Sequence, residues 1–240
     1  MARTEAAIRL DTETPTNIDR LERAGDNIAA NQALPSHVRI ADCWDATHAV
    51  TQNDVNLVIR HREVPEGLLG FVDALHPSKL PLESRTVATS QARSAVAGFI
   101  AQLWPEPTLG RQLLCHDVSN MVELFAEIAK TRRVRISVQG QAKAPQGTFQ
   151  AVAEAMWLEI LYRGPSLEWL PEGAADRELL DTQDNDLICD DPSAVRGLPR
   201  FSVALIKGER YSGNAGGGLI VRNPAVGKDQ PRLAVRLDCG

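Results

Sequence analysis

The hydrophobic periodicity of this chain changes near residue 133, and that change restricts the folds the chain can adopt. Before it, segments 65–75, 89–104 and 111–130 place hydrophobic residues three and four positions apart, which is typical of amphipathic helices. After it, VRISV, FQAVAEAMWLEILY, FSVALIKG, GLIVRNP and RLAVRLDC alternate with a period of two, which is typical of strands. We expect an α+β fold in which a helical N-terminal layer packs on a C-terminal antiparallel β-sandwich or barrel.

The two ends of the chain differ in their capacity to form a core. Residues 1–34 carry few large hydrophobic side chains, which predicts a flexible or loosely packed segment. We expect residues 35–240 to form a single domain, with its β-rich half at 133–240. Between Tyr162 and Arg200 runs a long acidic connection, which is either a functional lid or a solvated surface excursion.

Composition excludes some function classes. The net charge of −5 offers no basic field for nucleic acid. No stretch approaches the roughly 20 apolar residues that span a bilayer, and the first residues lack a secretory signal pattern, so we expect a cytoplasmic protein without a membrane contact. The four cysteines are widely separated, which is typical of reduced thiols.

Three candidate motifs do not match the residue pattern of the functional site that each one suggests. The glycine-rich GNAGGG at 213–218 matches no nucleotide-binding loop and precedes a strand-like run rather than a helix. The acidic run DTQDNDLICDD lacks the glycine and glutamate of a calcium loop. No two of the five histidines have the i, i+2 or i, i+4 spacing of a metal site.

Several C-terminal segments together carry a resemblance to a known family: FQAVAEAMWLEILYRGPSLEWL, VALIKGERYSGNAGGGLIVRNP and PRLAVRLD. They resemble domain-of-unknown-function family 1826, a largely bacterial and uncharacterised family, over roughly residues 50–239. The family pattern has F-H-x-D on one strand and H-R-S-P on a later one. The resemblance implies a cupin-like double-stranded β-helix in which the two histidines and the aspartate form a facial metal triad.

This chain departs from the family pattern at each implied metal ligand. F-H-x-D falls on Phe149, Gln150, Ala151 and Val152, and H-R-S-P falls on Val221, Arg222, Asn223 and Pro224. Valine and glutamine cannot replace imidazole and carboxylate as ligands of a divalent cation. We therefore expect no metal and no cofactor. The alternative is iron held by substitute ligands, such as Glu154 with His116 or Cys115.

The polar residues near these positions are the candidate site. If Gln150 and Val152 face inward, strand parity also turns Glu154, Met156 and Leu158 inward and Trp157 and Glu159 outward. Burial would then raise the pKa of Glu154, as a general acid or base requires. Glu154 is the predicted catalytic residue; the predicted ligand-binding residues are Gln150, Val152, Lys207, Val221 and Arg222.

Three functions remain open from the sequence. The first is a metal-independent protein, such as a biosynthetic tailoring enzyme, that binds or converts a small molecule in an apolar β-barrel pocket. The second is a non-haem metal-dependent oxygenase with substitute ligands. The third is a catalytically inactive scaffold that contacts a protein partner through the acidic 172–191 loop.

Overall fold

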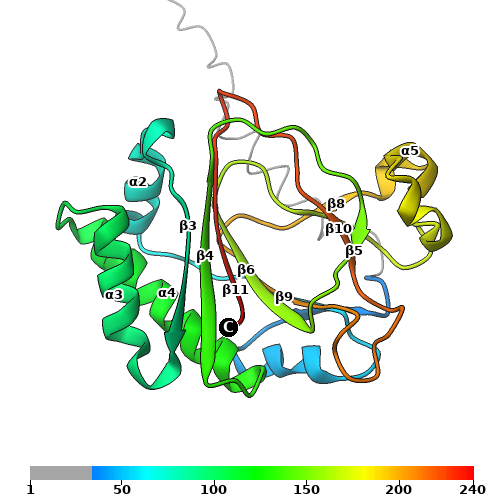
Figure 1. The fold of residues 1–240 in the computed structure, drawn as a ribbon, viewed down its shortest axis with the longest axis horizontal. Coiled ribbons are helices and arrows are strands. Elements are labelled where there is room, and N and C mark those ends of the chain that lie inside the picture. Colours follow the sequence, from blue (N-terminus) through cyan, green and yellow to red (C-terminus); the bar gives the residue numbers. More distant parts are fainter. Residues whose placement is uncertain (1–33) are drawn as a thin grey trace, which may run out of the picture. The chain divides into compact units, whose positions relative to one another are not determined.

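Two β-sheets organise residues 34–240, which the computed structural model describes (Figure 1). The seven-stranded sheet has the order β1-β2-β9-β6-β11-β4-β3: Val38–Ala41, Leu57–Arg60, Val203–Lys207, Met156–Arg163, Arg232–Cys239, Arg133–Gln141 and Leu82–Ala88. The four-stranded sheet has the order β5-β10-β7-β8: Gln150–Ala151, Ile220–Arg222, Glu168–Leu170 and Arg196–Gly197. All strand pairs are antiparallel except the parallel pair β1–β2.

Three helices cover one face of the seven-stranded sheet (Figure 1): α2 (Glu66–Ala74), α3 (Ala92–Leu103) and α4 (Leu109–Ile128). Helix α4 begins after Thr108, whose hydroxyl accepts a hydrogen bond from the backbone N–H of Arg111. The shorter helices are η2 (Asp45–Thr51), η3 (Pro77–Lys79), η4 (Thr89–Gln91), η5 (Arg177–Thr182), α5 (Asn185–Ile188) and η6 (Pro192–Ala194). No helix in residues 34–240 is both long enough and apolar enough to cross a bilayer.

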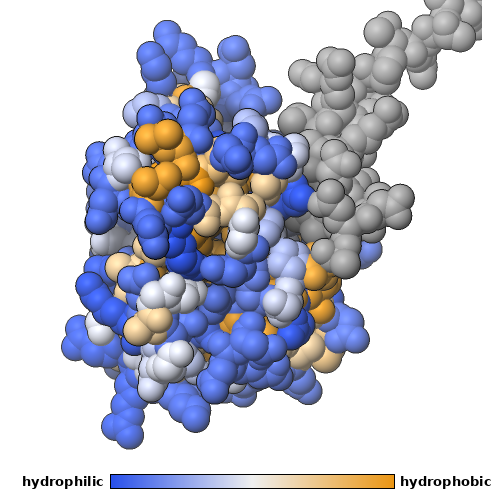
Figure 2. Space-filling view, turned by 90° about the vertical axis from the view of Figure 1, so that its right-hand side faces the viewer, coloured by the Kyte–Doolittle hydropathy of each residue, from blue (hydrophilic) through white to orange (hydrophobic). Residues whose placement is uncertain are grey.

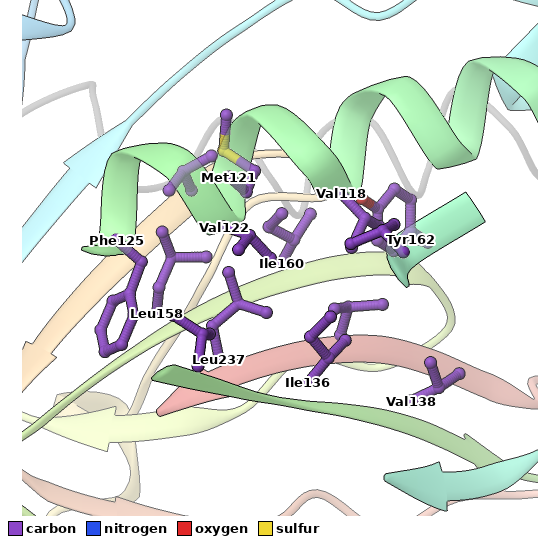
Figure 3. Close-up of a cluster of buried hydrophobic side chains, with 14 of the residues drawn as sticks. Val118, Met121, Val122, Phe125, Ile136, Val138, Leu158, Ile160, Tyr162 and Leu237 are labelled. Atoms are coloured by element: carbon purple, nitrogen blue, oxygen red, sulfur yellow. The ribbon is translucent and has the colours of Figure 1, made fainter. Parts of the chain in front are cut away.

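The largest hydrophobic core lies between these helices and the seven-stranded sheet. Helix α4 directs one hydrophobic stripe at the strands, and Figure 3 shows Val118, Met121, Val122 and Phe125 above Leu158, Ile160, Ile136 and Leu237. Burying a side chain of this size contributes about 1.5–3 kcal/mol. The helical period of 111–130 and the alternation within β4, β6 and β11 therefore describe the two sides of one interface.

Two smaller cores lie on the two faces of the four-stranded sheet. The inner core lies between the sheets and combines side chains from both: Val38, Leu57, Ile59, Val152, Trp157, Leu167, Trp169, Leu198, Ala204, Ile206, Leu219 and Val221. The outer core packs the 172–195 excursion onto the other face, through Phe149, Leu170, Ile188, Cys189 and Ile220. The four-stranded sheet is thus covered on both faces.

The expected fold class is confirmed as a mixed fold with a large, mostly antiparallel sheet. The helical N-terminal layer is not confirmed, because the N-terminal half contributes the strands β1, β2 and β3 as well as helices. The acidic connection is neither a bare loop nor a lid over the inner core, since it contains β7, β8 and three short helices. The prediction for residues 1–34 falls almost entirely outside the described residues.

The glycine-rich stretch makes a tight turn that approaches the 152–155 segment closely. Gly213 and Gly216 have φ values of +81° and +72°, which glycine adopts without steric cost. A Cβ on Gly208 would lie 2.1 Å from the carbonyl oxygen of Glu154, and one on Gly218 would lie 2.6 Å from that of Val152. The glycines therefore serve chain geometry here, as their sequence context predicts.

We expect Gly208→Ala to lower the free energy of unfolding by about 2–3 kcal/mol, because the added methyl group meets backbone that cannot rotate away. Gly227→Ala is the matched control, since its Cβ would have no neighbour within 4 Å. Its effect should stay within about 0.5 kcal/mol. Urea unfolding measures both, and equal stabilities of the two variants would contradict the close approach.

Candidate binding site between the sheets

Strand β6 turns alternate side chains to the two cores of the seven-stranded sheet. Leu158 and Ile160 pack in the helix-facing core, whereas Trp157 belongs to the core between the sheets. Glu159 shares the side of Trp157, since its register partner Ala204 also lies in the inner core. The expected parity, with Leu158 inward and Trp157 and Glu159 outward, is therefore wrong.

The parity changes because the run FQAVAEAMWLEILY is not one strand. It bends at residues 153–155, and its two parts, β5 and β6, belong to different sheets. The 208–210 segment holds the bend through backbone hydrogen bonds, from Gly208 N to Ala155 O and from Glu209 N to Val152 O. A bend of this kind resets which face each later residue occupies.

The structure brings Gln150, Val152 and Val221 together on the inner side of the four-stranded sheet. Gln150 is the register partner of Val221, and Val152 and Val221 share the inner hydrophobic core. The two valines are 2% exposed, while Gln150 is exposed at the sheet edge. The three positions are thus neighbours, and two of them present only methyl groups.

A charged pair adjoins these positions on the seven-stranded sheet. The guanidinium of Arg236 (β11) lies 3.2 Å from the ring centroid of Trp157 and donates from Nη2 to Glu154 Oε1 at 2.8 Å. Burial lowers the pKa of Arg236, while the carboxylates of Glu154, Glu159 and Asp238 oppose that change. Glu154 lies at the bend with its side chain 38% exposed, so the burial on which its predicted acid–base role depends is incomplete.

Three donors in this region have no hydrogen-bond partner among the described residues. They are Nε1 of Trp157, Nε1 of Trp169 and Nε of Arg236, each buried. Leaving a buried donor unpaired costs about 1–3 kcal/mol. Both tryptophans belong to the inner core, and the Arg236 guanidinium lies over one of them. These three donors on or beside the inner core are therefore left without an acceptor by the described part of the protein.

A second arginine in the same region, Arg232, uses its side-chain donors in contacts within the protein. Arg232 is 1% exposed at its side chain and forms a 2.7 Å ion pair with Glu159, which is 3% exposed. It also donates to Gln139 Oε1 and to the backbone oxygen of Pro165, both at 3.2 Å. Arg232 therefore fixes β11 to β6 and to the 164–165 turn.

Two predicted ligand-binding residues lie elsewhere. Lys207 points to the opposite face of its sheet, where Nζ donates to the backbone oxygen of Gln52 at 2.6 Å and lies 5.1 Å from the Tyr211 ring centroid. Arg222 follows Val221 directly and so faces the outer side of the four-stranded sheet. It pairs there with Glu168 at 2.5 Å and stacks on Phe149. Neither joins Gln150 and Val221.

The residues at the predicted metal positions do not fit an iron ion. Residues 34–240 contain no group of three His, Cys, Asp or Glu side chains that could hold a metal. His116 and Cys115 lie on α4, which packs on the face of the seven-stranded sheet opposite the inner core. His37 is buried, which lowers its pKa, and its Nε2 accepts a hydrogen bond from Glu172 N. The substitute ligand sets with Glu154 are thus not assembled.

Residues 41–238 match the family model described as "Protein of unknown function (DUF1826)". The chain belongs to this family. The match confirms the resemblance carried by the C-terminal strands and the glycine turn. A comparison with curated proteins finds no match.

Solved structures that resemble the fold include dioxygenases. The "dioxygenase for auxin oxidation (DAO) in rice" is 15% identical, covers 85% of this chain and 82% of its own, and has a TM-score of 0.45. AtDAO1 from Arabidopsis thaliana in complex with 2-oxoglutarate is 8% identical, covers 85% and 91%, and has a TM-score of 0.46. EctD from S. alaskensis with bound Fe is 12% identical, covers 77% and 73%, and has a TM-score of 0.36.

The expectation that the protein uses no cofactor is corrected by these comparisons, because the matched structures include forms with iron and with 2-oxoglutarate. Gln150, Val152 and Val221 supply no imidazole or carboxylate, so these three residues do not form an iron site.

Sequence reasoning missed Trp157, Trp169 and Arg236. Trp157 and Arg236 lie on strands that alternate, and alternation favours placing one face in solvent. Trp169 lies on the three-residue strand β7, whose segment shows no alternation. In this fold both faces of β6 and β11 are covered, so the polar side of β11 faces the inner space. Arg and Asp occur in β11, although other parts of the protein cover both faces of this strand. Charged residues in such a strand were the signal that could have identified Arg236.

Several acidic residues of the 172–191 segment have local structural roles, as helix caps or in an ion pair. Asp176, Asp184 and Asp191 each cap a short helix by accepting from backbone N–H groups. Glu172 pairs with Arg177, which lowers the pKa of the Glu172 carboxyl. A protein partner for this segment stays a prediction.

Proposed function

We propose that this protein is a cupin-like, oxygenase-related protein that binds a small organic molecule between its two sheets. The ligand has an apolar body and carries a carbonyl or carboxylate oxygen. One observation carries the proposal: the unpartnered donors of Trp157, Trp169 and Arg236 on or beside the inner core.

The proposed site has an apolar wall and a polar wall. Val152 and Val221 present only methyl groups, which favours an apolar contact with the ligand. Trp157 provides an aromatic face and a donor in one side chain. Arg236 lies over that ring, and Glu154 balances its charge. An oxygen placed among these donors would remove their desolvation cost, so binding and stability would rise together.

Trp157→Phe tests the site, because it removes the donor and keeps most of the aromatic contact. Hexanoate, benzoate and naphthoate serve as probes in saturation-transfer difference NMR, beside native mass spectrometry for a co-purified ligand. We expect at least one probe to bind and Trp157→Phe to weaken it about 5–10-fold, the effect of losing a hydrogen bond of about 1–1.4 kcal/mol.

Trp104→Phe is the matched control. Its Nε1 is also buried without a partner, but the side chain lies in the helix-facing core. Probe affinity should be unchanged in this variant. Equal weakening in both variants, or no binding by any probe and no co-purified ligand, would contradict the proposal. Stoichiometric iron in the purified protein would instead favour the oxygenase alternative with a ligand set other than Gln150, Val152 and Val221.

A further inference from the structure

A cavity of about 610 Å³ lies on the outer side of the four-stranded sheet, away from the inner core. The 182–195 part of the excursion forms one wall, and Phe149 and Arg222 lie on the sheet side. This side of the molecule, which carries α5, is predominantly hydrophilic (Figure 2). The site proposed above uses Val221 and faces the other way, so the cavity is a separate feature.

Arg222 is positioned in this cavity rather than mobile. Its guanidinium lies 4.1 Å from the ring centroid of Phe149, and its Nε donates to Glu168 Oε2 at 2.5 Å. Gln146 also donates to Glu168 Oε2, at 3.3 Å, which fixes the carboxylate. Within residues 34–240 the structure records no acceptor for either Nη group of Arg222. Two donors of a fixed planar fork are therefore available to a carboxylate.

The opposite wall carries negative charge. Asp184 and Asp186 line the cavity, and Asp184 Oδ1 accepts from the backbone N–H groups of Asp186 and Leu187. No hydrogen bond to the carboxylate of Asp186 is recorded in the described part of the chain. The Asn185 side chain accepts from Phe149 N and donates to Gly147 O, which ties this wall to the sheet. Asp184 and Asp186 thus lie on a wall that is fixed to the sheet.

The charges select one class of ligand. A dianion such as phosphate would meet Asp184 and Asp186, and a simple cation would leave the Nη donors of Arg222 without an acceptor. Only a molecule with both charges satisfies one arginine and two carboxylates. Cys189, Pro192 and Val195 add apolar surface to the lining. We propose that this cavity binds an amino-acid-like zwitterion with an apolar side chain, its carboxylate on Arg222 and its ammonium group on Asp186.

Three probes that share a carbon skeleton test the proposal on the full chain: L-leucine, 4-methylpentanoate, which lacks the amine, and 3-methylbutylamine, which lacks the carboxylate. Titration is followed by the backbone amide NMR signals of residues 182–186, and the indole N–H signal of Trp157 reports separately on the inner site. We expect leucine to bind at the 182–186 signals at least tenfold more tightly than either analogue. Equal or tighter binding of an analogue there, or no leucine-induced shift, would overturn the proposal without bearing on the inner site.

Two variants test which residue contacts the ammonium group of leucine and which contacts its carboxylate. Asp186→Asn should remove the preference for leucine over 4-methylpentanoate, and Arg222→Gln should remove the preference over 3-methylbutylamine. Asp190→Asn, an exposed acid of the same segment outside the cavity lining, should leave all three affinities unchanged. If Arg222→Gln does not fold, Asp186→Asn decides alone. Unchanged leucine preference in Asp186→Asn would overturn the assignment.

Discussion

Replacing Arg232 by methionine is expected to lower the free energy of unfolding by about 3–5 kcal/mol, because it leaves the Glu159 carboxylate buried without its counter-ion. The pair is almost inaccessible, at 1% and 3% side-chain exposure. The same change removes the donors to Gln139 and to the Pro165 carbonyl. Urea unfolding at neutral pH, followed by far-UV circular dichroism, measures the loss.

The double variant Arg232→Met, Glu159→Leu is the control for this prediction. Replacing both members of a buried pair by apolar residues of similar size is often neutral. We expect it to recover most of the stability that the single variant loses. A single variant that costs less than about 1 kcal/mol would show that the pair is solvated, and so would a double variant that is no more stable than the single one.

The second large effect is expected for Asp117→Ala on helix α4. The Asp117 carboxylate pairs with Arg62 through both of its oxygens and accepts from the Tyr162 hydroxyl at 2.5 Å. Arg62 and Asp117 are 9% and 12% exposed at their side chains, and burial raises the pKa of Tyr162 well above its usual value. The variant leaves a buried guanidinium and a buried hydroxyl unpaired, at a cost of about 3–5 kcal/mol.

Two comparisons isolate the contribution of burial at Asp117. Asp73→Ala breaks an ion pair with Arg200 whose side chains are 43% and 36% exposed, so it should cost less than about 1 kcal/mol. Tyr162→Phe removes one hydrogen bond of the buried network and should cost about 1–2 kcal/mol. Chemical denaturation of the three variants under one condition gives the ranking. Asp117→Ala no less stable than Asp73→Ala would disprove the network.

Most regular elements of the fold were predictable from hydrophobic period. The three helical segments became α2, α3 and α4, and the runs from 133 onward supplied β4, β9, β10 and β11. The strands β7 and β8 were not predictable, since they are three and two residues long and lie in an acidic segment without alternation. The pairing of β7 with β10 and of β8 with β7 depends on contacts distant in sequence, which local propensity does not encode.

The site was predictable in part. The family resemblance identified Gln150, Val152 and Val221, which the structure brings together. It could not identify Trp157, because the bend at 153–155 reverses the parity along β6, or Arg236, because both faces of β11 are covered. Lys207 and Arg222 followed from proximity in sequence to the glycine turn and to Val221, and adjacent residues on a strand face opposite sides. Val221 and Arg222 are adjacent in the chain, yet Val221 faces the inner core and Arg222 faces the outer cavity.

The position of β11 has a consequence for the route by which the chain folds. The last strand lies between β6 and β4, in the middle of the larger sheet, and pairs with both along nearly its whole length. Until residues 232–239 are present, both neighbours expose unpaired edges, and the polar groups on those edges are sites for intermolecular pairing. Folding is therefore dominated by contacts between distant parts of the sequence and should be slow, with aggregation as its main competitor.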